Sequence, residues 1–387
     1  MKKIIFVSGI QIFPPQSGGQ IRTANFCRSL VKSGFCVEIY SFTGRKNDYL
    51  NFNNSSEQLI NDNLNEYTNR NIFFGIIQFI TYHLRLPPFW LTLLTMFQTP
   101  SILKYKIKKS DLIIVDFPYL YPLAKHTQKP FYLNTHNAEF EIYNNFSLIS
   151  NLVKKIELAG FDKSKKVFFC NTNDQRKYIK QLPDLLAKSF ILPNGIDIFD
   201  FKHNDELRQK TRKLMKISDN TKVFLFTGSQ YLPNKEALEF LIRWCEANQE
   251  EILKLNILVL VVGSVSEDLI DKNYIKVIGK VQNIVPYFSA SDYGINPIIT
   301  GSGTNVKMSE FMAAELPILT TVFGSRGFTL VDNQSCWFFE RDQLLKTMKN
   351  VILQNSIHCK SMTSNAFIQN IEKIDMFRAL NSLRIQW

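Results

Sequence analysis

The stretch that decides the fold of this chain reads GSGTNVKMSEFMAAELP and spans residues 301–317. A loop of small residues comes first, and its glycines let the backbone approach a ligand closely. A run of helix-forming residues follows, whose free N–H groups and dipole favour an anion at its start. Pro317 is expected to end this helix before an apolar strand at 318–322. This order of elements predicts an anion site at the edge of a sheet.

Lys307 and Glu310 lie three residues apart in this stretch, so a helix places them on one face. A cation and a hydroxyl-binding carboxylate beside an anion site suit a sugar nucleotide. The alternative is an ordinary loop and helix start that carries a Lys–Glu pair at the surface.

The composition describes a soluble globular protein that favours anionic partners. The 387 residues suffice for two domains. The 46 Lys and Arg residues exceed the 34 Asp and Glu residues, which favours phosphorylated ligands, an anionic membrane surface or nucleic acid. A nucleic-acid binder needs a recognisable module or clustered stacking aromatics, and the sequence contains neither, so we expect no nucleic-acid partner.

The six cysteines are scattered, and no Cys-x-x-Cys pair occurs. This pattern predicts neither a disulfide framework nor a zinc site, and it favours a reducing cytoplasm. The apolar start at 3–9 is too short for the core of a signal peptide, and Pro14 and Pro15 follow soon after it. We interpret this start as a buried first strand.

Alternating strand and helix patterns predict an α/β protein. An apolar run at 3–9, a Pro- and Gly-rich loop at 11–19, a helical pattern at 20–33 and a second apolar run at 35–42 form a βαβ unit. The pattern begins again with a strand at 223–227. We therefore predict two doubly wound domains, with ligands at the carboxyl ends of the strands.

Residues 72–97 contain two strongly apolar halves separated by Arg85 and two prolines. Neither half reaches the roughly 20 apolar residues that span a membrane. We predict two short core helices. The alternative is an apolar patch, within an insert at 72–109, that rests on a membrane beside basic residues such as Lys104 and Lys108.

A polar cluster follows the strand predicted at 129–133. His136 lies just past the end of this strand, with Asn137 and Glu139 close by in the sequence. A position at the carboxyl edge of a parallel sheet favours contact with a ligand. The alternative is a structural histidine.

Five pieces of the sequence occur together in one order. They are Ser17-Gly18-Gly19 followed by Arg22, Thr135-His136-Asn137-Ala138-Glu139, Pro193-Asn194-Gly195-Ile196-Asp197, Thr227-Gly228-Ser229 with Pro233-Asn234, and residues 301–317. In this order and spacing the chain resembles the retaining GT-B glycosyltransferases, often described as glycosyl transferases group 1. Many members of that family act in bacterial envelope polysaccharide biosynthesis. The resemblance is weakest at about 43–110 and after 340.

The resemblance implies a GT-B fold, with two doubly wound Rossmann-like domains that face each other across a cleft. The expected boundaries are 1–200 for an acceptor-side domain that holds the 72–109 insert, 201–370 for a donor-side domain, and 371–387 for a helix that packs back on the first domain.

The resemblance also implies roles for residues at matching positions. The glycine loop at 18–19 faces the donor diphosphate and the acceptor, His136 faces the transferred sugar, and Glu310 holds the ribose hydroxyls. Lys307 is our own addition, as a cation for the diphosphate. The expected catalytic residues are His136, Glu310 and Lys307, and the expected substrate-binding residues are Gly18, Gly19, Asn137, Glu139, Asn194, Gly228, Ser229, Lys235, Ser302, Gly303, Thr304 and Asn305.

Two positions depart from the family pattern. Many members carry Glu eight residues before the ribose-binding Glu, where this chain has Ser302. Many also carry Arg just after the first glycine of the second domain, where this chain has Ser229. Lys235 matches a lysine that follows in the family, and Lys307 is expected to supply the missing positive charge.

The implied function is transfer of a sugar from a nucleoside diphosphate sugar to a saccharide or lipid-linked acceptor of the cell envelope, with retention of anomeric configuration. No cofactor is expected, and the lack of an Asp-x-Asp motif fits a site without metal. The expected location is the cytoplasm, peripherally at the inner face of the plasma membrane.

Other functions compete with this one. A sugar-nucleotide epimerase or hydrolase shares the architecture, and a catalytically weak nucleotide-sugar-binding scaffold subunit is kept open by Ser302 and Ser229. A Rossmann oxidoreductase is disfavoured, because residues 17–19 do not begin a G-x-G-x-x-G motif and no acidic residue lies near Phe42 as a ribose ligand.

Overall fold

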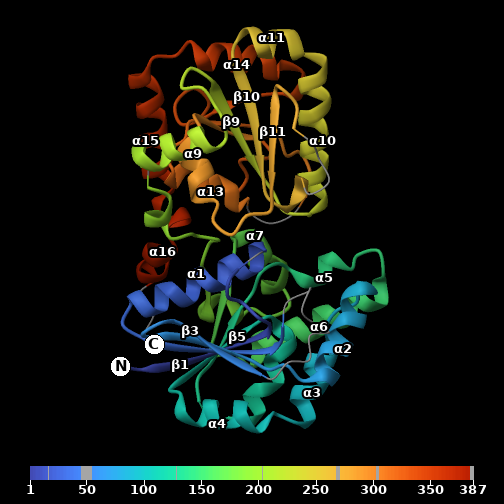
Figure 1. Cartoon of the computed structure of the whole chain (residues 1–387). Coiled ribbons are helices and arrows are strands. Elements are labelled where there is room, and N and C mark those ends of the chain that lie inside the picture. Colours follow the sequence, from blue (N-terminus) through green and yellow to red (C-terminus); the bar gives the residue numbers. More distant parts are fainter. Residues whose placement is uncertain are drawn as a thin grey trace. The chain divides into compact units, whose positions relative to one another are not determined.

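The computed structural model describes residues 1–15, 17–44, 55–127, 129–202, 204–266, 271–301 and 305–383. The chain divides into two compact units, of which the first holds residues 1–194 and the segment from Met376, and the second holds residues 195–375. Each unit has a sheet with helices on both of its faces (Figure 1). The structure therefore confirms the predicted α/β class.

The first unit contains one sheet of eight strands in the order β3-β4-β2-β1-β5-β6-β7-β8. All neighbouring pairs are parallel except β3 with β4. Its strands are β1 (Lys3–Ile10), β2 (Cys36–Thr43), β3 (Ser56–Asn61), β4 (Leu64–Thr68), β5 (Leu112–Asp116), β6 (Phe131–Asn134), β7 (Lys166–Phe169) and β8 (Ser189–Ile191).

Helices connect these strands and cover both faces of the sheet. They are α1 (Gly18–Lys32), α2 (Ile72–His83), α3 (Phe89–Phe97), α4 (Ser101–Lys109), the 3₁₀ helix η2 (Pro118–His126), α5 (Glu139–Ile142), α6 (Ser147–Lys163), α7 (Thr172–Ile179), α8 (Leu185–Lys188) and α16 (Met376–Ser382). The last of them, α16, lies beside α1 (Figure 1) and buries Met376, Ala379 and Leu380 in the core of this unit.

The second unit contains a parallel sheet of six strands in the order β11-β10-β9-β12-β13-β14. Its strands are β9 (Lys222–Thr227), β10 (Ile257–Val262), β11 (Ile275–Gly279), β12 (Tyr293–Asn296), β13 (Ile318–Thr320) and β14 (Trp337–Phe338). Its helices are η3 (Ile198–Phe201), α9 (Asp205–Leu214), α10 (Leu232–Ala247), α11 (Gln249–Lys254), η4 (Ser264–Ser266), α12 (Val285–Ala290), α13 (Val306–Ala313), η5 (Arg341–Gln343), α14 (Leu344–Ile352) and α15 (Ser356–Ile374).

Hydrophobic side chains alternate between the two faces of each central strand. In β9, Phe224 and Phe226 join one buried cluster, whereas Val223 and Leu225 join another. The strand β1 divides its residues in the same way between two clusters of the first unit. Because successive side chains of a strand point to opposite faces, each sheet needs helices on both sides. This pattern is the physical basis of the doubly wound fold.

A buried carboxylate on β4 anchors the loop that precedes α1. Glu66 accepts hydrogen bonds from the backbone N–H groups of Ile12 at 2.6 Å and Phe13 at 2.7 Å. It also accepts one from the hydroxyl of Ser41 on β2. These bonds satisfy donors that would otherwise be buried without partners. The polar strand β4, which the sequence pattern does not predict, thus holds the glycine loop in place.

The stretch at 301–317 differs from the prediction at its end. The helix α13 ends at Ala313, three residues before the expected stop, and Glu315 takes a positive φ of 54°. The apolar strand β13 is also shorter than predicted, at Ile318–Thr320. The position of α13 after β12, the fourth strand of the unit, agrees with the sequence.

Candidate functional site

In the first unit, three polar side chains at the ends of β5 and β6 meet a fourth from α1. The carboxylate of Asp116 lies 2.7 Å from Nε2 of His136 and accepts a hydrogen bond from the side-chain amide of Asn134 at 2.8 Å. It also accepts one from the hydroxyl of Thr23 on α1 at 3.0 Å. The four side chains are buried. Parallel neighbouring strands bring these residues to one edge of the sheet.

The carboxylate fixes the orientation of the His136 ring. An ionised Asp116 only accepts hydrogen bonds, so Nε2 of His136 carries the hydrogen that points to it. The other ring nitrogen, Nδ1, faces α1, since a Cβ atom placed on Gly19 would lie 3.3 Å from it. The structure thus brings Gly19 and His136 together. A Cβ atom placed on Gly18 would have no neighbouring atom of the described residues within 4 Å.

A strained backbone residue supports the same histidine. Phe117 follows Asp116 directly and adopts a φ of 75°, which bulky residues rarely do. Its ring stacks on the His136 ring with the centroids 4.3 Å apart. Strain of this kind is found at sites whose geometry the surrounding structure enforces. The ring of His136 is therefore held on one edge by Asp116 and on one face by Phe117.

Arg22 has a structural role next to this cluster. Its buried guanidinium donates to the carbonyl oxygens of Leu192 and Pro193 and to the side-chain oxygens of Asn194 and Asn134. Asn194, an expected substrate ligand, therefore accepts a hydrogen bond from Arg22. This network joins α1 to the end of the first unit and holds the loop that precedes the second.

Glu139 and Glu157 form a buried pair of carboxyl groups beside the histidine. Glu157, on α6, accepts hydrogen bonds from the backbone N–H groups of Glu139 at 2.8 Å and Phe140 at 3.2 Å. Oε1 of Glu139 is buried and has no hydrogen-bond partner among the described residues. Burial, reinforced by the negative charge of Glu157, raises the pKa of Glu139 to about 8. Burial likewise raises the pKa of Glu157 to about 7.

This raised pKa makes the stability of the protein depend on pH. The folded state retains the Glu139 proton up to about pH 8, whereas the unfolded chain loses it near its ordinary pKa of 4.5. The unfolded state then binds fewer protons, so the free energy of unfolding should fall as pH rises from about 4.5 to about 8. Glu139→Gln should flatten this decline. The decline is measured as the difference between the free energies of unfolding in urea at about pH 5.5 and about pH 8.5.

The matched control for this prediction is Glu141→Gln. Glu141 lies on the same short helix α5 but is exposed. The assignment of the titration to Glu139 would be wrong if both variants reduced the fall in unfolding free energy with pH by the same amount. It would also be wrong if Glu139→Gln left that fall unchanged.

In the second unit, glycines bring the ends of β9 and β10 close together. Gly263 follows β10 with a φ of 118°, and a Cβ atom there would lie 2.1 Å from the carbonyl oxygen of Gly228. Only glycine fits this position. Gly228 in turn packs against the side chain of Asn234 on α10. The side-chain amide of Asn234 donates to the backbone carbonyl of Ser229 at 3.2 Å.

Lys307 is directed inward from α13. Its ammonium group donates to the side-chain oxygen of Asn234 at 2.9 Å and lies 4.3 Å from the centre of the Phe226 ring. The side chain is buried, and burial lowers the pKa of Lys307 well below its ordinary value. The contact joins the stretch at 301–317 to the glycine loop after β9.

Glu310 lies one turn further along α13 and is also buried. Burial raises its pKa above the ordinary value, and the charge of Lys307 acts in the opposite direction. Asn305, just before α13, donates through its side chain to the carbonyl oxygen of Gly324 at 2.9 Å. A buried carboxyl group near a buried ammonium group at the carboxyl edge of a parallel sheet suits a ligand that has hydroxyl groups and an anionic group.

Other expected site residues are placed as follows. Lys235 is exposed on α10, next to the buried Asn234. Ser302, Gly303 and Thr304 lie outside the described residues. The preceding Gly301 has a φ of 112°, and a Cβ atom there would lie 2.8 Å from Pro233 at the start of α10. Asn137 is half-buried beside Glu139.

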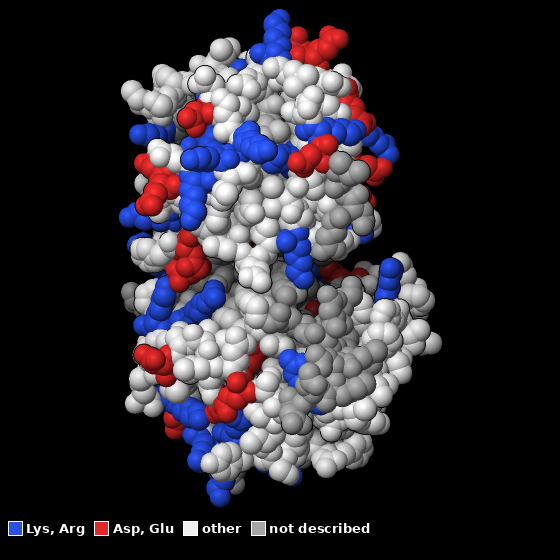
Figure 2. Space-filling view, in the orientation of Figure 1, with Lys and Arg blue, Asp and Glu red and all other residues white. Residues whose placement is uncertain are grey.

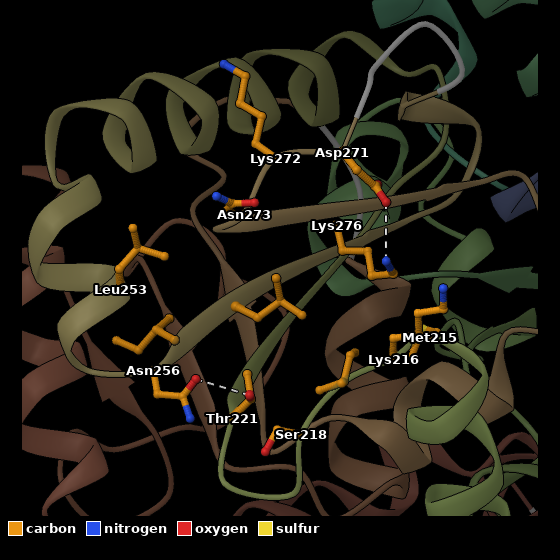
Figure 3. Close-up of a pocket in the computed structure, with 13 residues that line it drawn as sticks. Met215, Lys216, Ser218, Thr221, Leu253, Asn256, Asp271, Lys272, Asn273 and Lys276 are labelled. Carbon is orange, nitrogen blue, oxygen red and sulfur yellow. Dashed lines mark hydrogen bonds and ion pairs between the residues drawn. The ribbon is translucent and has the colours of Figure 1, made fainter.

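A cavity of about 440 Å³ lies elsewhere in the second unit, at the amino ends of β9, β10 and β11 (Figure 3). Thr221 and Asn256 line it and are hydrogen-bonded to each other. Lys276, another lining residue, pairs with Asp271 at 3.3 Å. Sheets of this type bind ligands at the opposite, carboxyl edge. The cavity is therefore separate from the candidate site. In the described ranges, no three His, Cys, Asp or Glu side chains are grouped to hold a metal ion.

The sequence analysis did not single out Asp116 or Thr23, and it named Asn234 only as part of the Pro233-Asn234 motif, without a role. Asp116 ends the apolar strand β5, and a lone carboxylate at that position is a usable signal. Asn234 lies three and four residues before Ala237 and Leu238, so helical periodicity places it on the buried face of α10. Thr23 has no such signal, because its partner is 93 residues away in the sequence.

Residues 221–353 match the model of the family described as Glycosyl transferases group 1. The comparison with curated proteins found no match. Among solved structures, the chain is similar to sucrose-phosphate synthase from Thermosynechococcus elongatus, with a TM-score of 0.68, 11% identity, and 99% of this chain and 98% of the other covered. A glycosyltransferase from Rickettsia africae has a TM-score of 0.65 and 16% identity, with 99% and 97% covered.

A third similar structure is HepE from Anabaena in complex with UDP and glucose. It has a TM-score of 0.64 and 13% identity, with 99% of each chain covered. These similarities establish the fold: two parallel-sheet Rossmann-like domains that match GT-B glycosyltransferase structures.

Proposed function

We propose that this protein is a glycosyltransferase that transfers a sugar from a nucleoside diphosphate sugar to an acceptor, with retention of anomeric configuration and without metal. A glycosyl transferases group 1 domain at 221–353, and structural neighbours that are glycosyltransferases, support an enzyme of this type. The proposed acceptor is a lipid-linked or growing saccharide of a bacterial cell envelope.

The observation that carries the proposal is the arrangement around α13. The family match includes α13, Lys307 and Glu310, and both side chains are buried at the carboxyl edge of the sheet. HepE was solved with UDP and with UDP-glucose. By analogy, the ribose hydroxyls of the donor would bind Glu310, and Lys307 would face the diphosphate.

The chemistry requires stabilisation of the leaving group. When the bond from the anomeric carbon to the diphosphate breaks, negative charge grows on the phosphate oxygens, and preorganised donors lower that barrier. Lys307 and the backbone N–H groups at the start of α13 would supply them. Asn234 positions Lys307 for this role through the hydrogen bond at 2.9 Å.

In the first unit, His136 would orient or polarise the donor sugar. Its Nε2–H is engaged with Asp116 and its Nδ1 faces Gly19, so Nδ1 is the atom that remains for a substrate hydroxyl. We assign no residue as a covalent nucleophile. Asp116, Asn134 and Phe117 are positioning residues for this ring.

Product analysis tests the proposal. The purified protein is incubated with a panel of nucleotide sugars and a bacterial lipid extract, with and without a chelator. The expected product is a glycosylated acceptor that keeps the donor's anomeric configuration by NMR, formed equally with the chelator. An altered sugar nucleotide would show an epimerase, free sugar alone a hydrolase, and binding without turnover a scaffold subunit.

A further inference from the structure

The outer sides of α2 and α3 carry large apolar side chains that no other part of the unit covers among the described residues. On α2, Phe73, Ile76 and Ile80 follow at intervals of three and four and share one face. On α3, Met96 and Phe97 are exposed, and the Phe97 side chain is 81% accessible. The outer face comprises Phe73, Ile76, Ile80, Leu84, Leu93, Met96 and Phe97, each exposed by more than a third.

The inner sides of these two helices are already packed. Phe74 lies against Trp90 with ring centroids 5.6 Å apart, and both pack near Phe42 of β2. The indole N–H of Trp90 donates to the side chain of Gln78 at 3.0 Å. The helices are therefore anchored without help from the outer face. The two predicted helices exist, but their outer apolar side chains are exposed and do not belong to the core.

The segment of the chain that carries α2, α3 and α4 has charges of one sign. No Asp or Glu occurs from residue 67 to residue 110. Arg85, Lys104, Lys108 and Lys109 are exposed, and we call them the basic rim. Lys106 does not belong to it, since it is buried in an ion pair with Glu38. In the view of Figure 2, the described side chains at the margin of the first unit where α2 and α3 lie are mostly white.

An exposed tyrosine on α4 is of the type that is common at the boundary between a lipid bilayer and water. Tyr105 is 54% exposed, and the ammonium group of Lys109 lies 4.4 Å from the centre of its ring. Tyr and Lys side chains combine an apolar body with a polar end, which suits the boundary between acyl chains and head groups. Among the described helices, none is long and apolar enough to cross a membrane.

We propose that the outer face and the basic rim bind the surface of an anionic lipid bilayer. The apolar side chains enter the boundary of the acyl chains while the rim contacts the anionic head groups. A second copy of the chain is a poorer occupant, because a two-fold contact through this face places one basic rim against another. This inference is independent of the proposed sugar transfer.

Vesicle sedimentation with the full chain tests this inference. Phosphatidylcholine vesicles with and without phosphatidylglycerol are compared, and binding is expected only when phosphatidylglycerol is present. Lys104→Gln/Lys108→Gln/Lys109→Gln should weaken the binding on the order of a hundredfold, since each cation near the surface contributes about a factor of five. Phe73→Ser/Phe97→Ser should weaken it by roughly tenfold or more.

The matched control is Leu353→Ser/Ile357→Ser, which removes two strongly exposed apolar side chains from the second unit. It should bind vesicles like the wild type, and all variants should keep the wild-type thermal midpoint. Equal binding to both vesicle types, no binding, or an equal loss in the control would overturn the proposal. So would a wild-type dimer that Phe73→Ser/Phe97→Ser converts to a monomer, since the face would then join two copies.

Discussion

Replacing His136 with alanine should lower kcat by on the order of a hundredfold or more, a loss typical of a positioned acid–base or polarising group. The ring is held by the Asp116 carboxylate at 2.7 Å and by the stacked ring of Phe117. An apolar side chain at position 136 would fill the same buried space without needing a hydrogen-bond partner. Packing alone therefore does not explain a histidine whose ring is held in one orientation at the carboxyl edge of the sheet. The steady-state rate of nucleoside diphosphate release measures the effect.

The control for this prediction is His83→Ala. His83 is exposed at the end of α2, so its removal should leave kcat unchanged. The thermal midpoint of each variant shows whether the fold persists. Asp116→Asn provides a second measurement, because it keeps the shape of the side chain and removes the charge that orients the ring. We expect a smaller loss of kcat, and full activity in a folded His136→Ala protein would refute the role.

Replacing Glu310 with glutamine should weaken donor binding by about tenfold to a hundredfold. Hydrogen bonds from hydroxyl groups to an ionised carboxylate contribute about 1.5–3 kcal/mol, and a neutral amide supplies only part of this. Because burial raises the pKa of Glu310, the comparison is made at a pH above that raised pKa. Glu310 is buried on α13, one turn after Lys307. Calorimetric titration with the preferred nucleotide sugar, and with the nucleoside diphosphate alone, measures the change.

The control for Glu310 is Glu315→Gln. Glu315 belongs to the same stretch but is exposed, so its substitution should leave donor affinity unaltered. The two substitutions have the same chemistry and differ in burial. Equal donor affinity in Glu310→Gln and the wild type would remove the residue from the binding site.

Regular apolar periodicity predicted most of the elements that carry the candidate site. The strands β1 and β6 and the helix α1 fall close to their predicted ranges. The strands β3 and β4 were not predicted, because β3 is an exposed edge strand and β4 carries the buried Glu66. A charged residue inside a strand interrupts the pattern of apolar residues on which such predictions depend.

Site residues that the local sequence pattern marks could be predicted, whereas residues that depend on contacts between distant parts of the chain could not. His136 and Glu310 lie at positions that a βα pattern marks, since both follow a strand and its loop. The roles of Asp116, the partner of His136, and of Asn234, the partner of Lys307, arise from contacts between neighbouring strands or distant helices. Asn234 and Lys307 are 73 residues apart, and only the folded sheet brings them to 2.9 Å.

The most direct test of the central claim is turnover of a nucleotide sugar by the purified wild-type protein in the presence of a lipid-linked saccharide acceptor. We expect release of nucleoside diphosphate that depends on the acceptor, together with one new sugar on that acceptor, and we expect His136→Ala to slow both by on the order of a hundredfold or more. A folded wild-type protein that neither binds nor consumes any nucleotide sugar would contradict the account.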